Sequence, residues 1–209
     1  MTVNVLFSEQ FLETLKTVIG MHHVLYRDVP PQGIYFEELV EETFRRIRVP
    51  FTPVTPGGTV AADRDLMIGR DKISLKTETG QGTRLDSISI TKLSTTERDP
   101  WEATALVQHV MGHLGRYEHM LMLRAVWSDR VIHYQVVDIP LTLLRKLGSA
   151  DYKPVGTRKT RQSIGADVFD DRGVAFHVHF DGSDGKCQIR NLDRGRCNTL
   201  REWDYQFRD

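Results

Sequence analysis

The sequence predicts a mixed central β-sheet flanked by helices, in the α/β or α+β class, followed by a C-terminal β-meander. Segments with helical spacing of apolar residues are interleaved with shorter segments of strand-like alternation. The segment HMLMLRAVW, at 119–127, is apolar enough for a central strand. Near the C-terminus, the turn-forming sequences DDRG and DGSDG separate three strands. The chain has 209 residues, which suits one domain with a sizeable core.

Two amphipathic helices are expected before the sheet. In the segment 7–26, apolar residues recur with a helical period behind Ser8, a residue type that caps helices. After the breaker RDVPPQG, the segment IYFEELVEETFRRI carries a second apolar stripe. Glu37 lies at the border of that stripe, whereas Glu41 is expected well away from it. A border acid at Glu37 is positioned to reach over the edge of the sheet.

The strands and the remaining helices follow in order. A hairpin is expected around Arg70-Asp71, and further strands at 87–93, 119–127 and 130–139. A third helix is expected at DPWEATALVQHV, and a short fourth helix closes at Gly148. The candidate capping residues of the third helix are Ser94, Thr95, Thr96 and Asp99.

Composition narrows the class of protein. Hydrophobic residues make up 40% and charged residues 27%, an ordinary globular mixture. Lys+Arg and Asp+Glu both number 28, which argues against a polycation that coats nucleic acid indiscriminately and still permits a local basic groove. Two cysteines favour a reducing compartment. No apolar run is long enough to span a membrane and the N-terminus lacks a signal-peptide pattern, so a cytoplasmic protein is expected.

The expected hairpin carries the residues that indicate chemistry. Ser74, Lys76 and Glu78 alternate with Ile73 and Leu75, so the polar residues share one strand face. Asp65 begins the preceding strand. A carboxylate binds Mg²⁺, and the metal polarises a phosphate and activates water. An ammonium beside it orients that water and offsets transition-state charge. The pattern therefore favours metal-assisted phosphodiester cleavage.

These residues resemble the PD-(D/E)xK nuclease superfamily over residues 33–137. The matching pattern is Asp65-Leu-Met-Ile, the turn Gly-Arg-Asp-Lys, then Ile-Ser74-Leu-Lys76, and GIYFEELVEETFRRI is similar to the first core helix of Mrr-type nucleases. The resemblance implies a restriction-endonuclease-like core in which Asp65, Glu37 and the main-chain carbonyl of Leu75 bind Mg²⁺. It places Lys76 at the attacking water.

Ser74 departs from the family pattern, which usually has Glu or Asp at this position. Some restriction endonucleases are similar in carrying Ser-x-Lys, with the missing acid supplied by a helix. Candidates for that acid are Glu78 on the same strand face and Glu97 or Glu102 near the next helix. Alternatively, Glu37 together with Asp65 suffices.

The C-terminal third predicts a DNA-reading surface. In VAFHVHF and KCQIRNL, one face is apolar and the other polar, and a two-stranded ribbon fits a major groove. Arg and Gln are the side chains that read guanine and adenine edges. A basic arm precedes this hairpin and suits phosphate contact. A solvated sheet face and a solvated loop are the alternatives. The candidate DNA-binding residues are Lys153, Arg158, Lys159, Arg161, Gln162, His177, His179, Lys186, Gln188 and Arg190.

Together these features predict a Mg²⁺-dependent type II restriction endonuclease that cuts double-stranded DNA. Residues 1–209 are expected to form one nuclease domain, with an N-terminal helical extension at 1–32, a catalytic core at 33–148, and the basic arm and meander at 149–209. A homodimer matches palindromic DNA, and a cognate DNA methyltransferase is expected in the same system. The alternatives are a Holliday-junction or modified-DNA nuclease, and a catalytically inactive DNA-binding module.

Overall fold

The computed structural model describes residues 3–54, 65–96, 99–156 and 161–207, with only the backbone described at 3, 4, 54 and 65. The chain forms two compact units. The first comprises 1–83, 117–139 and 198–209, and the second comprises 84–116 and 140–197. The chain passes from the first unit to the second and back twice, so each unit is assembled from segments distant in sequence. The mixed sheet with flanking helices confirms the predicted fold class.

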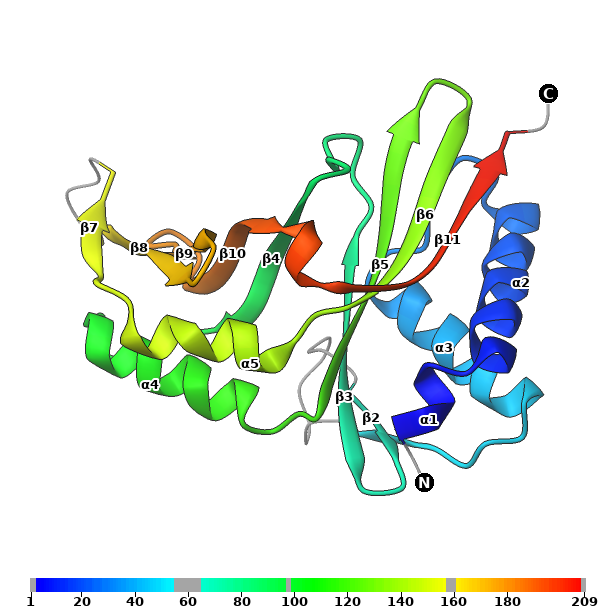
Figure 1. The fold of residues 1–209 in the computed structure, drawn as a ribbon, viewed down its shortest axis with the longest axis horizontal. Coiled ribbons are helices and arrows are strands. Elements are labelled where there is room, and N and C mark those ends of the chain that lie inside the picture. Colours follow the sequence, from blue (N-terminus) through cyan, green and yellow to red (C-terminus); the bar gives the residue numbers. More distant parts are fainter. Residues whose placement is uncertain (1–2, 55–64, 97–98, 157–160, 208–209) are drawn as a thin grey trace. The chain divides into compact units, whose positions relative to one another are not determined.

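The first unit is built on a six-stranded sheet in the order β1-β2-β3-β5-β6-β11 (Figure 1). Only β3 and β5 run parallel, and the other neighbours are antiparallel. The parallel pair requires a crossover, which the segment containing α4 (Ala103–Leu114) supplies. The strands are Thr52–Val54 (β1), Asp65–Ile68 (β2), Asp71–Glu78 (β3), His119–Ser128 (β5), Val131–Asp138 (β6) and Asn198–Gln206 (β11).

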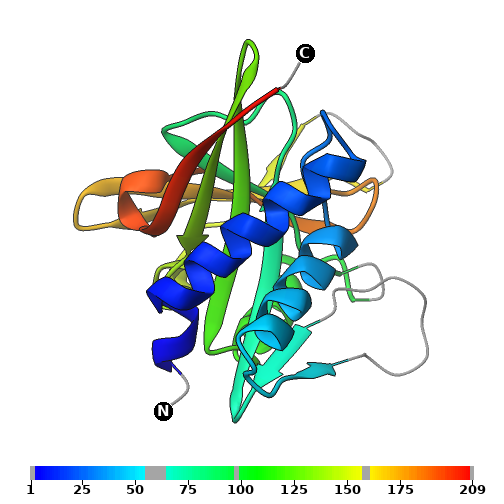
Figure 2. The same cartoon turned by 90° about the vertical axis from the view of Figure 1, so that its right-hand side faces the viewer.

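Helices α1 (Val3–Leu6), α2 (Glu9–Leu25) and α3 (Ile34–Arg46) belong to the same unit, and α2 and α3 lie side by side across one face of the sheet (Figure 2). Ser8 caps α2 as predicted, because its Oγ accepts a hydrogen bond from the Phe11 amide. Phe11 and Phe44 stack at 5.0 Å between the two helices. Apolar side chains of both helices and of β2, β3, β5 and β6 form one buried core.

The second unit contains a five-stranded antiparallel sheet in the order β4-β10-β9-β8-β7. The predicted meander is β8, β9 and β10, and β4 and β7 extend it at its two edges. The strands are Ser87–Thr95 (β4), Lys153–Val155 (β7), Ser163–Asp170 (β8), Gly173–Phe180 (β9) and Lys186–Asp193 (β10). The helices are α4, α5 (Leu141–Leu144) and two short 3₁₀ helices, Arg145–Ser149 and Arg194–Arg196.

Three local expectations are corrected by the structure. Helix α4 begins at Ala103 with Glu102 as its N-cap, because β4 continues through Ser94 and Thr95 to pair with β10. Glu41 is only 6% exposed, although the sequence placed it away from the apolar stripe. Glu41 follows Val40 and lies three residues before Phe44. Glu37 likewise follows Phe36 and lies three residues before Val40, so both acids lie at the border of the apolar stripe. The edge strands β1, β7 and β11 were not expected.

No described helix combines the length and the apolar character needed to cross a membrane.

Candidate active site and nucleic-acid interface

The predicted hairpin is present as β2 and β3, joined by a tight turn at Gly69-Arg70. Gly69 has a φ of +63°, a conformation that glycine adopts without steric cost. Leu66 pairs with Ile73 and Ile68 with Asp71. One further step in this register sets Asp65, the first residue of β2, opposite Ser74. The two positions that open the predicted motif are therefore neighbours across the hairpin.

The two faces of β3 have different surroundings. Ile73 and Leu75 enter the core beneath α2 and α3. Ser74 and Lys76 belong to the opposite face, beside Met120 and Met122 of β5. Ser74 is fully buried and Lys76 is 7% exposed. An ammonium removed from water to this extent needs compensating acceptors or anions.

The Ser74 hydroxyl is buried and has no hydrogen-bond partner among the described residues. An unsatisfied buried polar group costs about 1–3 kcal/mol relative to an apolar replacement. An alanine would fill the same space without this cost. A buried hydroxyl of this kind is rare in folded proteins, and a role in binding or catalysis is one explanation for it.

Glu78, the third residue of this face, binds Arg124. The Arg124 Nε lies 2.7 Å from Glu78 Oε2, and the Arg124 side chain is fully buried. The Arg124 guanidinium also donates to the Gln135 side-chain oxygen, and Gln135 Nε2 donates to Glu202 Oε1 at 2.7 Å. The chain of contacts joins β3, β5, β6 and β11. Arg124 and Gln135 were not predicted, although each is a long polar residue inside an otherwise apolar strand.

Glu37 lies in the first turn of α3 and is 8% exposed. The amide of Gly33, which precedes α3, donates to Thr77 Oγ1 at 3.2 Å, so the start of the helix contacts β3. Thr77 shares the face of Leu75, whereas Lys76 belongs to the opposite face. Among the described residues, no strand pairs with β3 beyond Ser74 on its β2 side. Among the residues that the structure describes, the edge of β3 at Lys76 is therefore open to a side chain from α3.

The other candidate acids do not lie on this hairpin. Glu97 lies outside the described residues. Glu102 is an exposed residue of the second unit and caps α4. No group of three potential metal ligands is present among the described His, Cys, Asp and Glu side chains, a set that does not include the Asp65 carboxylate.

Pairing in the second sheet brings most of the predicted DNA-binding residues to one face. Lys153 pairs with Gly165, Gly165 with His179, and His179 with Gln188, so these residues form a row across four strands. Asp167, His177 and Arg190 form the adjacent row. Lys186 shares the same face of β10.

Specific contacts order this face. Arg190 is exposed, and its Nε and Nη2 donate to Gln188 Oε1 at 3.0 and 2.6 Å. His177 Nδ1 lies 3.0 Å from Asp167 Oδ1. Burial, and secondarily the Arg190 guanidinium, lower the pKa of His179 below its ordinary value. His179 is therefore neutral at pH 7 and offers one donor and one acceptor.

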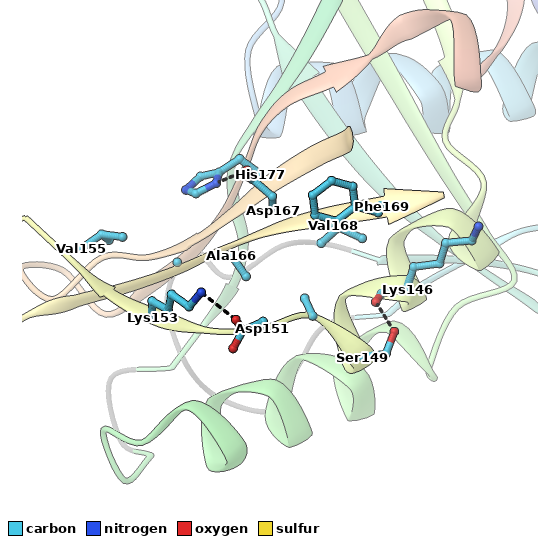
Figure 3. Close-up of a pocket in the computed structure, with 12 residues that line it drawn as sticks. Lys146, Ser149, Asp151, Lys153, Val155, Ala166, Asp167, Val168, Phe169 and His177 are labelled. Atoms are coloured by element: carbon cyan, nitrogen blue, oxygen red, sulfur yellow. Dashed lines mark hydrogen bonds and ion pairs between the residues drawn. The ribbon is translucent and has the colours of Figure 1, made fainter. Parts of the chain in front are cut away.

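An open pocket of about 590 Å³ adjoins this face. Figure 3 shows Lys153 turned toward Asp151 and His177 turned toward Asp167 along its lining. Gly165 gives His177 room, since a Cβ there would stand 3.1 Å from His177 Nε2. The lining combines cations with carboxylates, so the pocket has no uniform charge.

The basic arm is described in part. Arg161 stacks over the Trp101 ring at 3.7 Å, and the Trp101 indole donates to the Gln162 carbonyl. The Gln162 side chain donates to the Gly156 carbonyl at 2.8 Å. Arg158 and Lys159 lie outside the described residues.

Comparison with known protein families gives a match over nearly the whole chain. The model of the SmaI family, described as type II site-specific deoxyribonuclease, matches residues 1–205. No curated protein and no solved structure matches the chain. The family match covers both compact units and nearly the whole sequence.

Proposed function

The chain belongs to the SmaI family of type II site-specific deoxyribonucleases, and from this premise we propose that the β2–β3 hairpin is its Mg²⁺-dependent cleavage centre, in the manner of the PD-(D/E)xK nucleases. The observation that carries the proposal is the burial of Lys76, two residues from Ser74, whose buried hydroxyl has no hydrogen-bond partner among the described residues. A buried ammonium is useful in a reaction that develops negative charge, because it stabilises that charge with little screening by water.

Type II restriction enzymes generally need a divalent metal. The candidate ligands near the hairpin are all oxygens: the carboxylates of Asp65 and Glu37 and the main-chain carbonyl of Leu75. This donor set fits a hard cation such as Mg²⁺ better than zinc, which prefers nitrogen and sulfur ligands. A bound Mg²⁺ would polarise the scissile phosphate and lower the pKa of a bound water.

The residues of the chain have separate roles in this proposal. Lys76 orients the attacking water and offsets the charge that develops on the phosphate, and its burial keeps water from screening that charge. Ser74 occupies the position of the usual second acid and offers a hydroxyl in its place. Glu78 already neutralises Arg124, so Glu37 is the better candidate to complete the acidic set with Asp65.

The polar face of the second sheet is the proposed reading surface. Gln188 fixes the guanidinium of Arg190, and a fixed guanidinium matches the two acceptors that guanine presents in the major groove. Lys153, Lys186 and the basic arm would contact phosphates and thereby position the DNA. His177, His179 and Gln162 provide hydrogen-bonding groups whose partners on DNA depend on the target sequence.

A two-fold homodimer would bring one hairpin to each strand of a palindromic site. The enzyme would act in the cytoplasm, beside a cognate methyltransferase that protects the host DNA. The family description favours an active enzyme over an inactive DNA-binding module.

Digestion of a plasmid of known sequence tests the cleavage centre. We expect discrete, Mg²⁺-dependent fragments from the wild type. Lys76→Met and Asp65→Asn should each lower the cleavage rate by about 10²-fold or more, the usual effect of removing a group that stabilises transition-state charge. Lys72→Ala is the matched control, a lysine of the same strand and face nearer the turn, and it should cleave at nearly the wild-type rate. Undiminished cleavage by Lys76→Met would overturn the assignment.

A further inference from the structure

The first unit carries a concentration of exposed apolar side chains at the end of α2 and the start of α3. Ten large hydrophobic side chains are exposed among the described residues, and seven of them lie between residues 21 and 35. Val24 and Leu25, the most exposed, are 77% and 79% accessible. Met21, Val24 and Leu25 have the three- and four-residue spacing that places them on one face of α2. We call these seven exposed hydrophobic side chains within 21–35 the apolar patch.

The patch is continuous between the two helices. Tyr26 at the end of α2 contacts Tyr35 at the start of α3, with ring centroids 5.6 Å apart. The Val29 amide donates to the Tyr26 carbonyl, which folds the connecting loop back against the end of α2. His22 supports both rings from below, at 4.8 Å from Tyr26 and 5.9 Å from Tyr35. Ile34 adds its exposed side chain next to Tyr35.

Its size and charge match a protein partner. Each of the seven side chains exposes on the order of 100 Å², so together they expose roughly 700 Å². This area is close to the roughly 800 Å² that each partner buries in a standard protein–protein interface. Within 21–35 the only charged residues are Arg27 and Asp28, both exposed. A surface for DNA would carry an excess of lysine and arginine. Soluble monomers rarely expose an apolar patch of this size without a function.

We propose that the apolar patch is the surface on which two copies of this chain associate about a two-fold axis. The inference rests on the proposed homodimer and names the surface that forms it. In a two-fold interface, each contact between residues i and j occurs twice. Adjacent charges of opposite sign are therefore self-complementary: Arg27 pairs with Asp28 of the partner subunit, and Asp28 pairs with Arg27 of the partner subunit. Neither side chain forms an ion pair with another described residue of its own chain.

Charge reversal tests this reciprocity by sedimentation velocity. Arg27→Asp and Asp28→Arg should each weaken the dimer, raising its Kd by about tenfold or more, since each places like charges together twice. The double variant Arg27→Asp/Asp28→Arg restores both pairs and should dimerise like the wild type. An equimolar mixture of the two single variants should form a heterodimer, because its contacts are again of opposite sign. Equal dimerisation of all these proteins would overturn the proposal.

A second pair of variants tests the apolar contact. Val24→Asp/Leu25→Asp should sediment at the monomer mass of 24.0 kDa, with an unchanged circular dichroism spectrum because both side chains are exposed in the monomer. Leu85→Asp, an exposed leucine of the second unit, is the control and should remain dimeric. If the wild type and Val24→Asp/Leu25→Asp are both dimeric, the apolar patch is refuted as the interface, and the homodimer itself is not. A wild type that is monomeric with and without DNA refutes the homodimer itself, and cleavage by Lys76 is tested separately.

Discussion

Replacing Arg124 by methionine isolates the buried charge network at the end of β3. The Arg124 side chain is fully buried, binds Glu78 at 2.7 Å and donates to Gln135. Methionine keeps most of the volume and removes the positive charge. The Glu78 carboxylate would then lie only 12% exposed and without the Arg124 guanidinium. The expected result is a large loss of stability at a position outside the hydrophobic core.

The magnitude follows from the burial of both partners. Removing one member of a buried ion pair costs about 3–5 kcal/mol, because the other charge is left without compensation. Partial access of water to Glu78 favours the lower end, about 3 kcal/mol. Folded proteins are stable by about 5–15 kcal/mol, so this loss is a large fraction of the total. Arg201→Met is the control: Arg201 is 26% exposed and pairs with Glu9 and Glu13 on the surface, where a pair is worth about 1 kcal/mol or less.

Urea denaturation followed by circular dichroism measures the difference. We expect Arg124→Met to lose about 3 kcal/mol in the free energy of unfolding and Arg201→Met to lose less than about 1 kcal/mol. Adding Glu78→Gln to Arg124→Met removes the uncompensated charge and should recover at least about 1 kcal/mol. A loss of under about 1 kcal/mol for Arg124→Met, or no recovery in the double variant, would refute the reasoning.

Three further outcomes are expected. Ser74→Ala should raise the free energy of unfolding by about 1 kcal/mol, since it removes a buried hydroxyl that has no hydrogen-bond partner among the described residues, and should slow cleavage; a destabilised variant would contradict this. Burial lowers the pKa of His23, so the unfolded state binds its proton first and stability falls as pH drops below about 6.5. Urea unfolding at pH 7.5 and 5.5 should show this fall, and His23→Gln should reduce it. The wild type should cleave its cognate DNA site with a higher kcat/KM than sites that differ by one base pair. Arg190→Ala should reduce this preference by about 5–100-fold at one position of the DNA site, and an unchanged preference argues against base reading by Arg190.

The sequence predicted the fold where local pattern and tertiary role agree. Ser8 caps α2 because capping depends on a few adjacent residues, and the alternation correctly assigned the two faces of β9 at 176–180 and of β10 at 186–190. At the start of β9 it did not, because Val174 is exposed and Ala175 is buried. The family resemblance, carried by the hairpin and the first core helix, is confirmed at the level of a type II site-specific deoxyribonuclease.

Other features depend on contacts that no local pattern encodes. The strand β4 continues to Thr95 because its last residues pair with β10, which lies 91 residues or more away along the chain and leaves no local signal in β4. The strand β11 is likewise recognisable only from its pairing with β6. The pairing of Glu78 with Arg124 follows from the parallel register of β3 and β5, which alternation within β3 alone does not specify. The roles of Asp65, Glu37, Ser74 and Lys76 stay predictions.

Localising the metal tests the central claim most directly. Fe²⁺ substituted for Mg²⁺ generates hydroxyl radicals in the presence of ascorbate and peroxide, and these radicals cut the polypeptide next to the metal. Mass spectrometry of the fragments should give breaks near residue 65 and within 74–76, with a weaker break near residue 37. Excess Mg²⁺ should suppress them. Breaks confined to another acidic segment, such as the turn at 181–184, would contradict a cleavage centre at the β2–β3 hairpin.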